Sequence, residues 1–347
     1  MYLGDDRRYE VRRKLGDGTF GRVVECIDHN RRCRVAVKII RDVKRYVENA
    51  RIEARILERV NEIRRLSKDH QGGRGVVRLY DTFFHSAKHY CLSFEKLGKT
   101  LLEVIQLNNH CGFYLFDIKQ ISLELLETLD FIHTRCGLSH TDIKMENIML
   151  TGYDFICTKP PPRVRKSGVY QRPVLLSEQS RGRHKSIRLI DFGNGVFSGD
   201  HHSTTINTRQ YRSPEVILER AWDTKSDMWS AGCVIAEMFT GELLFGTHSN
   251  LEHLAMIQRV VEDSPLLAQS PKYANRFGRL NWPDGCESSD SFRSVNEAVA
   301  LSKMFYFHPS LLDLVSKLLR IDPDRRYSAG RAVDRSEFLY EKIPINE

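Results

Sequence analysis

The most informative segment of the chain is His140-Thr-Asp-Ile-Lys-Met-Glu-Asn147. The carboxylate of Asp142 can accept the proton of an incoming hydroxyl group. The side chain of Lys144 can neutralise a migrating phosphate, and Asn147 offers the neutral oxygen ligand that a hard cation such as Mg²⁺ accepts. These residue types in one short loop therefore indicate phosphate transfer.

A second candidate site lies in Asp191-Phe-Gly193, directly after the apolar run Ile187-Arg-Leu-Ile190. We expect Asp191 to bind Mg²⁺ together with the phosphates, and Gly193 to let the following loop move. This tripeptide alone carries little information. Its position downstream of the first loop makes coincidence a poor explanation and strengthens both assignments.

A glycine-rich segment, Gly16-Asp-Gly-Thr-Phe-Gly21, follows one strand-like run and leads into another. Glycines let the backbone fold closely over a polyphosphate and direct N–H groups toward it. An ordinary glycine turn is the alternative. Because the segment joins two strands, a dinucleotide-binding fold is disfavoured. The candidate phosphate-binding residues are Gly16, Asp17, Gly18, Thr19, Phe20 and Gly21.

The strand-like run Val35-Ala-Val-Lys38 ends on a lysine. A buried lysine without a partner is costly, and Glu53 on the following helical segment is the obvious partner. Such a pair would hold Lys38 against the α- and β-phosphates of a nucleotide. A surface salt bridge of little energetic value is the alternative.

The chain on either side of these motifs divides into two parts. Residues 9–41 read as strands, residues 47–66 as an amphipathic helix, and residues 76–80 and 90–94 again as strands. After Gly98 the pattern is mainly helical. We therefore predict an α+β fold with two lobes, a β-rich one followed by a larger helical one.

The composition is that of a globular protein. The 347 residues are 41% hydrophobic and 28% charged, and no apolar run approaches the roughly 18 residues of a membrane span. We expect no membrane contact. The eight cysteines form no C-x-x-C pair, which favours reduced thiols in the cytosol or nucleus. The net charge of +8 suggests an anionic ligand or partner, with a merely basic surface as the alternative.

One segment, residues 159–188, carries nine Lys or Arg and a single acid, Glu178. A run of three prolines begins at Pro160, and we interpret the segment as an exposed insertion. Contact with RNA or with a phosphoprotein is one hypothesis. A hairpin with a solvated charged face is the simpler one.

From about Tyr9 to Tyr340 the chain resembles the protein kinase superfamily, and within it the CDC-like, or LAMMER, kinases. The signature helix of that group is matched by Glu252-His-Leu-Ala-Met256, which continues Ile257-Gln-Arg259 where the family has M-E-R. The other local matches are Val24-Glu-Cys-Ile-Asp-His29, the H-T-D form of the catalytic loop, and His201-His-Ser-Thr-Thr205 with Thr208-Arg-Gln-Tyr-Arg-Ser-Pro-Glu-Val-Ile-Leu218.

The resemblance implies a bilobal fold and several site residues. A five-stranded sheet and one helix would occupy residues 9–95, and a helical lobe residues 96–342, with family insertions at 151–187 and about 251–308. The cofactors would be ATP and Mg²⁺, and Thr208 would bind Asp142 and Lys144. Adenine would be contacted by the gatekeeper Phe94, by the hinge residues Glu95 and Leu97, and by Leu15, Val23, Ala36 and Met149.

The resemblance also implies a biological role. Kinases of this group are nuclear, phosphorylate Ser/Arg-rich splicing factors and can autophosphorylate on tyrosine. We expect basic, Arg/Ser-rich protein substrates, a monomer, and a nuclear location with some protein in the cytoplasm. Glu146 beside the catalytic residues could pair with a substrate arginine. The alternatives are a divergent member acting in chromosome segregation or cell-cycle control, and a pseudokinase scaffold, for which no catalytic residue is missing.

Two residues depart from most kinases. Thr141 stands where an arginine usually binds an activation-loop phosphate, so we expect activity without that phosphate. Met145 replaces the usual proline and removes a restraint on the φ angle. We further expect two structural supports, an ion pair between Glu215 and Arg326, and contacts from Asp227 to backbone N–H groups of the catalytic loop.

Overall fold

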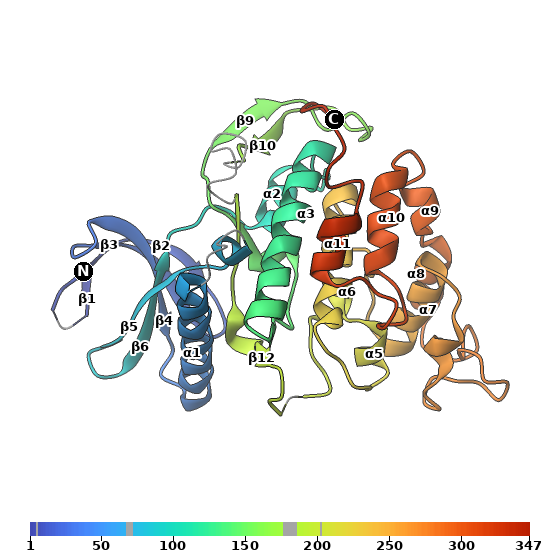
Figure 1. Ribbon diagram of the computed structural model, residues 1–347, viewed down its shortest axis with the longest axis horizontal. Coiled ribbons are helices and arrows are strands. Elements are labelled where there is room, and N and C mark those ends of the chain that lie inside the picture. The colour runs from blue at the N-terminus through green and yellow to red at the C-terminus, as the bar shows by residue number, and fades with distance from the viewer. Residues whose placement is uncertain (5, 67–71, 176–185, 202) are drawn as a thin grey trace.

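Short β-branched runs separated by glycines build one antiparallel sheet at the N-terminal end of the chain. The computed structural model describes residues 1–4, 6–66, 72–175, 186–201 and 203–347. Figure 1 shows this sheet with helix α1 as one lobe and a group of helices as the other. The strand order is β1-β2-β3-β4-β6-β5. The strands are β1 (Tyr2–Leu3), β2 (Tyr9–Asp17), β3 (Gly21–Asp28), β4 (Cys33–Ile40), β5 (Leu79–His85) and β6 (His89–Glu95).

The described part of residues 9–95 contributes five strands to this sheet, the number predicted, and the short strand β1 before them pairs with β2 and buries Leu3 completely. The strand predicted over residues 76–80 is wrong in position, since β5 begins at Leu79. Val76 instead forms an isolated parallel bridge with Leu189 and is fully buried. Its apolar character reflects this contact between distant segments.

Helix α1 (Lys44–Leu66) packs beside the sheet and contributes one buried charge. Its buried residues recur at three- and four-residue spacing, as an amphipathic helix requires. All but one are apolar, and the exception is Glu53. A carboxylate on the buried face of a helix needs a partner from another element.

The helical lobe is built around α6 (Lys225–Thr240), whose residues are almost all buried. Helix α3 (Leu115–Asp130) lies beside it and continues into a π-helical turn (Phe131–Arg135). Both belong to the main hydrophobic core. The other helices are α2 (Leu101–Leu107), α5 (Pro214–Ile217), α7 (Asn250–Val260), α8 (Ser289–Glu297), α9 (Leu301–Met304), α10 (Pro309–Leu318) and α11 (Ala329–Arg335). In the part of the chain that the structure describes, no helix is long and apolar enough to cross a membrane.

Two short strand pairs fix the segments that carry the sequence motifs. Strand β7 (Leu138–Ser139) pairs with β12 (Val196–Phe197), and β8 (Ile148–Leu150) pairs with β11 (Ile187–Leu189). The catalytic-loop motif therefore lies between β7 and β8, and the Asp191 motif lies between their partners. Segments about 50 residues apart in sequence are held side by side.

A hairpin of β9 (Phe155–Thr158) and β10 (Tyr170–Pro173) lies within the predicted insertion 151–187. Figure 1 places it against the helical lobe near α2 and α3. Residues 176–185 of this predicted basic insertion lie outside the described residues. The predicted insertion at about 251–308 contains helices α7, α8 and α9, and its status as an insertion stays a prediction.

Candidate active site

Asp227 of helix α6 holds the catalytic loop in place through hydrogen bonds to the loop's backbone. One carboxylate oxygen accepts the backbone N–H of Thr141 at 2.8 Å, and the other accepts that of His140 at 2.7 Å. His133 lies 2.9 Å from the second oxygen. Although burial opposes ionisation, these partners hold the pKa of Asp227 below its usual value. The predicted role of Asp227 as a support for this loop is confirmed.

Asp142 is the centre of the constellation predicted from the sequence. One of its carboxylate oxygens accepts the Thr208 hydroxyl at 2.7 Å, and the other lies 2.7 Å from the ammonium nitrogen of Lys144. Lys144 also donates to the Thr208 hydroxyl at 2.9 Å. Although burial acts the other way, Lys144 and Thr208 hold the pKa of Asp142 below its usual range. The carboxylate is therefore ionised and oriented, as an acceptor of a hydroxyl proton must be.

The side chain of Asn147 closes the catalytic loop. Its amide nitrogen donates to the Asp142 backbone carbonyl at 2.8 Å and to the Asp142 carboxylate at 3.2 Å. These bonds leave the amide oxygen of Asn147 for another partner. Met145, which stands in place of a proline, is fully buried in the main hydrophobic core and anchors the loop by packing.

The predicted ion pair between Lys38 and Glu53 is present. The ammonium nitrogen of Lys38 lies 2.8 Å from a Glu53 carboxylate oxygen, which satisfies the buried charge of helix α1. Although burial works against it, the negative charges of Glu53 and Asp191 raise the pKa of Lys38. Lys38 is thus a fixed cation close to both carboxylates. The arrangement brings Lys38, Glu53 and Asp191 together across the two lobes.

The donor set fits a divalent cation that takes some of its ligands from phosphate and water. Among the described residues, no group of three or more His, Cys, Asp or Glu could hold a metal ion. Asp191 and Asn147 supply only hard oxygen donors, and the motifs that carry them are held together by the β8–β11 pair. Asp191 has a left-handed backbone with φ of 62°, which an unstrained loop would rarely adopt. These two residues suit an Mg²⁺-type ion bound with a nucleotide.

The glycine-rich turn has room for a polyphosphate. A Cβ atom at Gly16 would meet no atom within 4 Å, and one at Gly18 would meet only the Gly21 carbonyl oxygen at 3.8 Å. At Gly21 a Cβ atom would collide with the Ile39 carbonyl oxygen. Gly21 is therefore required by the sheet itself. Gly16 and Gly18 leave open space of the kind that a close ligand needs.

The register of the sheet places three of the predicted adenine-binding residues, Val23, Ala36 and Phe94, on the face that carries Lys38. Val23 pairs with Lys38, and Ala36, two residues before Lys38, pairs with Phe94. Directly paired residues share a face of the sheet, as do residues two apart on one strand. Glu95 pairs with Val35 and so belongs to the opposite face.

Glu95 has a structural task besides the predicted hinge role. Its carboxylate accepts the backbone N–H of Arg78 at 2.8 Å and the guanidinium of Arg188 at 3.0 Å. Any contact of Glu95 with adenine would therefore use the backbone. Leu97 and Met149 lie close by, because Gly98 donates to the Leu150 carbonyl oxygen at 2.7 Å. Leu15 is more than a third exposed at the turn, and its contact with adenine stays a prediction.

The sequence prediction missed how Thr141 and His140 organise the loop. The Thr141 hydroxyl donates to the Asn194 carbonyl oxygen at 2.8 Å, so the residue that replaces arginine binds the backbone after Asp191. The His140 ring contacts the Ile190 carbonyl oxygen at 2.9 Å and packs edge to face on Phe192. Both residues stand inside the quoted motif, but their carbonyl partners leave no signal in the sequence.

A second carboxylate near the catalytic loop also escaped prediction. Glu237 of helix α6 is almost completely buried and accepts the Tyr211 hydroxyl at 2.6 Å. Burial, and to a lesser degree the negative charge of Glu146, raise the pKa of Glu237 to about 7. The predicted ion pair between Glu215 and Arg326 is also confirmed. The Arg326 guanidinium makes two hydrogen bonds of 2.7 and 2.9 Å to the Glu215 carboxylate.

These observations agree with comparisons to known proteins. The protein kinase domain family matches residues 9–338. The serine/threonine-protein kinase AFC2 of Arabidopsis thaliana is 39% identical over 344 residues, which are 95% of this chain and 77% of that protein. The human dual specificity protein kinase CLK2 is 36% identical over 349 residues, which are 97% of this chain and 65% of that protein.

A solved structure extends the agreement to three dimensions. The crystal structure of another kinase domain, 36% identical, covers 98% of this chain and 96% of its own with a TM-score of 0.86. The chain therefore belongs to the protein kinase family and is a phosphotransferase that uses ATP and a divalent metal ion. Within that family it is one of the CDC-like kinases, as the resemblance predicted.

Proposed function

We propose that this kinase uses ATP with Mg²⁺ to phosphorylate serine and threonine in basic, Arg/Ser-rich proteins such as splicing factors, and itself on tyrosine. The observation that carries the proposal is the network that Lys144 and Thr208 make with the ionised carboxylate of Asp142. The name of the relative CLK2 supports dual specificity. A monomer in the nucleus, with some protein in the cytoplasm, completes the proposal.

Each catalytic residue has a task that its geometry supports. The magnesium ion, when bound, neutralises charge on the phosphates. Lys38, fixed by Glu53, contributes a second positive charge on the nucleotide side. Asp142 accepts the proton of the substrate hydroxyl, and Lys144 neutralises the transferred group. Catalysis then comes mostly from positioning and charge, which a preorganised network provides without further rearrangement.

The local charge near Asp142 supports a basic substrate. Glu146 is exposed in the catalytic loop, and its negative charge helps to raise the pKa of the buried Glu237. A substrate arginine near Glu146 would relieve this repulsion between like charges. The net charge of +8, taken over the whole protein, instead repels a basic substrate. An acidic site near Glu146 on an otherwise basic protein would reconcile the local attraction with the overall repulsion.

Phosphorylation of an arrayed peptide library tests the substrate class. We expect arginine close to the acceptor residue to raise the rate, and acidic residues there to lower it. A preference for proline directly after the acceptor, or for acidic residues, would contradict the proposal. Imaging of the tagged protein and light scattering of the purified protein test the nuclear location and the monomer.

A further inference from the structure

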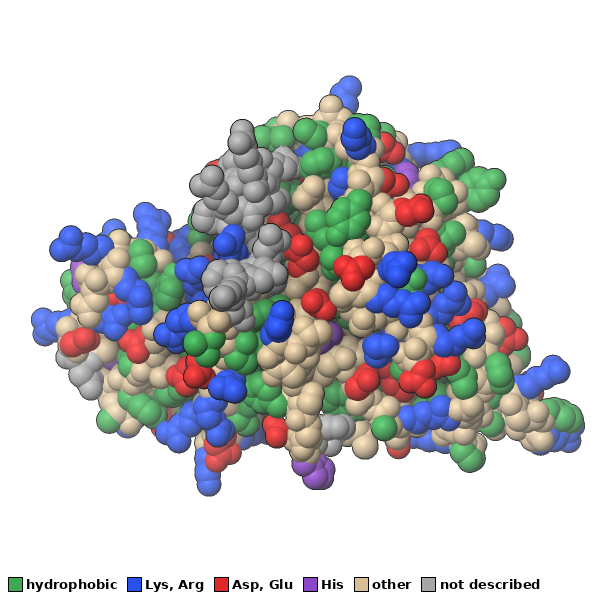
Figure 2. Space-filling view, in the orientation of Figure 1, with side chains coloured by type: hydrophobic (Ala, Val, Ile, Leu, Met, Phe, Trp, Pro, Cys, Tyr) green, Lys and Arg blue, Asp and Glu red, His purple; other side chains and the backbone are tan. Residues whose placement is uncertain are grey.

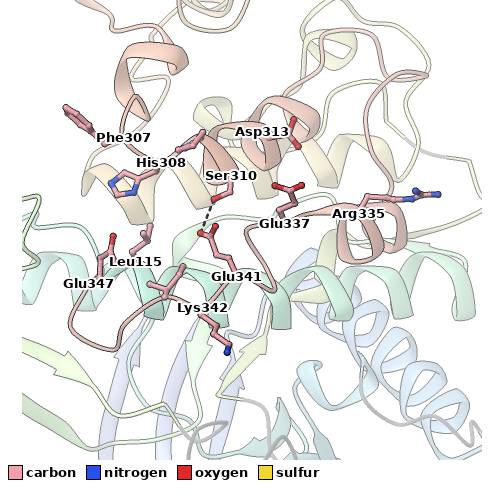
Figure 3. A pocket seen from close by; sticks show the side chains of 12 residues that line it. Leu115, Phe307, His308, Ser310, Asp313, Arg335, Glu337, Glu341, Lys342 and Glu347 are labelled. Atoms are coloured by element: carbon pink, nitrogen blue, oxygen red, sulfur yellow. Dashed lines mark hydrogen bonds between the residues drawn. The ribbon is translucent and has the colours of Figure 1, made fainter.

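A pocket of about 710 Å³ lies far from the catalytic loop, where the C-terminal segment of the chain meets helices α3 and α10. Figure 3 shows its lining. Leu115 at the start of α3 and Ile343 form part of the apolar lining, and Pro309 begins α10 beside them. The catalytic machinery uses none of these residues.

Several hydrogen bonds hold the pocket in shape. The backbone N–H of Leu115 donates to the Glu347 carbonyl oxygen at 2.7 Å, and the ammonium group of Lys119 donates to the Glu341 carbonyl oxygen at 2.8 Å. The Ser310 hydroxyl donates to the Glu341 carboxylate at 2.9 Å. A partner would therefore meet a preformed pocket and lose little free energy in ordering it.

Most of the charged side chains that line the pocket are negative, while the cations of Lys119 and Arg163 lie behind the lining at Glu341 and His308. Four carboxylates line it against two permanently charged cations, Arg335 and Lys342. Figure 3 shows both cations directed away from the carboxylates of Glu337 and Glu341. Burial, together with the charge of Arg163, lowers the pKa of His308, which favours the uncharged form of this histidine. The carboxylates belong to Asp313, Glu337, Glu341 and Glu347.

Two aromatic side chains stand at the edge of the pocket without cover. Phe307 lines it and is 85% exposed, and the neighbouring Tyr306 is 73% exposed. Their rings meet edge to face with centroids 5.1 Å apart. Exposed aromatic faces beside carboxylates suit a guanidinium group, which can stack on a ring while it pairs with an acid.

We propose that this pocket docks an arginine-rich segment of the protein substrate, at a distance from the residue that is phosphorylated. The shape, the negative charge and the exposed rings all favour arginine, and a polyanion would be repelled. The proposal rests on the basic substrate class proposed above. The pocket lies at the start of α3 and the catalytic loop follows its end, so the two are separated by about 24 Å, the length of a 16-residue helix. A docking segment would lie at least about seven extended residues from the acceptor.

A direct binding measurement tests the pocket without catalysis. The probe is a fluorescent peptide of alternating arginine and alanine that has no hydroxyl residue. Glu337→Gln combined with Phe307→Ala should weaken its binding about fivefold or more, and both side chains are exposed, so the fold should be retained. The matched control combines Asp290→Asn with Phe277→Ala, two changes at positions that are also exposed but lie outside the pocket. Equal binding by the pocket variant and the control would overturn the proposal.

Kinetics then separate docking from phosphate transfer. A short basic peptide should give the same kcat and KM in the wild-type protein and the pocket variant. For a peptide with an additional arginine-rich segment more than about seven residues from the acceptor, KM should rise in the variant at unchanged kcat. Loss of activity on both peptides, or on neither, would overturn the docking site. Activity on the short basic peptide tests the proposed function separately.

Discussion

The catalytic loop and the β9–β10 hairpin both bury charged side chains, but they use them differently. In the loop, Asp142 is ionised and bound to Lys144 and Thr208. In the hairpin, Arg172 makes two bonds of 2.8 and 2.6 Å to Asp117 and is almost completely buried. The charges of the catalytic loop are there for the phosphate-transfer reaction, whereas those of the hairpin attach the insertion to the helical lobe.

Arg163, like Arg172, is a basic residue that attaches the insertion to the helical lobe. Its guanidinium donates to the Phe113 and Phe239 carbonyl oxygens and lies over the Phe239 ring. Together with Arg172 and Arg188, it accounts for three of the nine basic residues of segment 159–188. A basic run in sequence is therefore not the same as a basic surface. This favours the hairpin interpretation over RNA binding for the part of the segment that the structure describes.

The largest expected effect falls on the catalytic loop. Asp142→Asn removes the acceptor of the substrate proton but keeps the hydrogen-bonding shape. We expect kcat to fall by about 10²–10⁴-fold with unfolding in urea little changed. Steady-state kinetics and a urea titration measure the two. A kcat near that of the wild-type protein would show that Asp142 is not the catalytic acceptor.

The corresponding change in the hairpin should affect stability and leave chemistry intact. Arg172→Ala removes the buried ion pair between Arg172 and Asp117, so the free energy of unfolding should fall by about 3–5 kcal/mol. The kcat of the folded protein should be unchanged. Arg165→Ala, at an exposed position of the same hairpin, is the matched control and should change neither quantity. A loss of kcat in folded Arg172→Ala protein would show that the hairpin contributes to catalysis and not only to stability.

A smaller effect is expected in the activation segment. Ser203, Thr204 and Thr205 are exposed, and Thr141 already binds the backbone after Asp191 without a phosphate. Replacing the three hydroxyl residues together with alanine should therefore change kcat by less than about tenfold. Thr208→Ala serves as the positive control, because it removes a direct partner of Asp142. A larger loss in the folded triple variant would mean that phosphorylation there is required.

The smallest effect is a pH-dependent change in stability at Glu237. Its pKa of about 7 in the folded protein lies above the ordinary carboxyl value, so the folded state holds a proton that the unfolded chain releases. This contribution favours folding at low pH and is lost as pH rises through about 7. Glu237→Gln should therefore be more stable than the wild-type protein at pH 8, by roughly 1–3 kcal/mol, with the gap closing near pH 5. Urea titrations at both values measure it, and equal stability at pH 8 would contradict the raised pKa.

The sequence predicted the contacts that side-chain chemistry demands. Lys38 needed an acid, and Glu53 was the nearest one on a buried helical face. Asp227 needed donors, and the pairing of Glu215 with Arg326 followed from the same reasoning. These predictions succeeded because an unpaired buried charge is too costly to leave in place.

The sequence did not reveal contacts to backbone carbonyl groups or between remote segments. Thr141 binds the carbonyl of Asn194, and any residue at that position would offer the same oxygen. The pairing of Arg172 with Asp117 joins an insertion to a helix 55 residues away, and many other acids were available. The pocket at the start of α10 depends on how the C-terminal segment folds back, which periodicity does not encode.

Transfer of radiolabelled γ-phosphate from ATP to a generic basic protein tests directly whether the chain is a working kinase. We expect steady transfer by the purified wild-type chain and none above background for Lys38→Met, with both proteins folded. Replacing Lys38 removes the cation that Glu53 and Asp191 hold in place. Absence of transfer by the folded wild-type protein would favour a scaffold without catalysis. Equal transfer by Lys38→Met would show that Lys38 has no catalytic role.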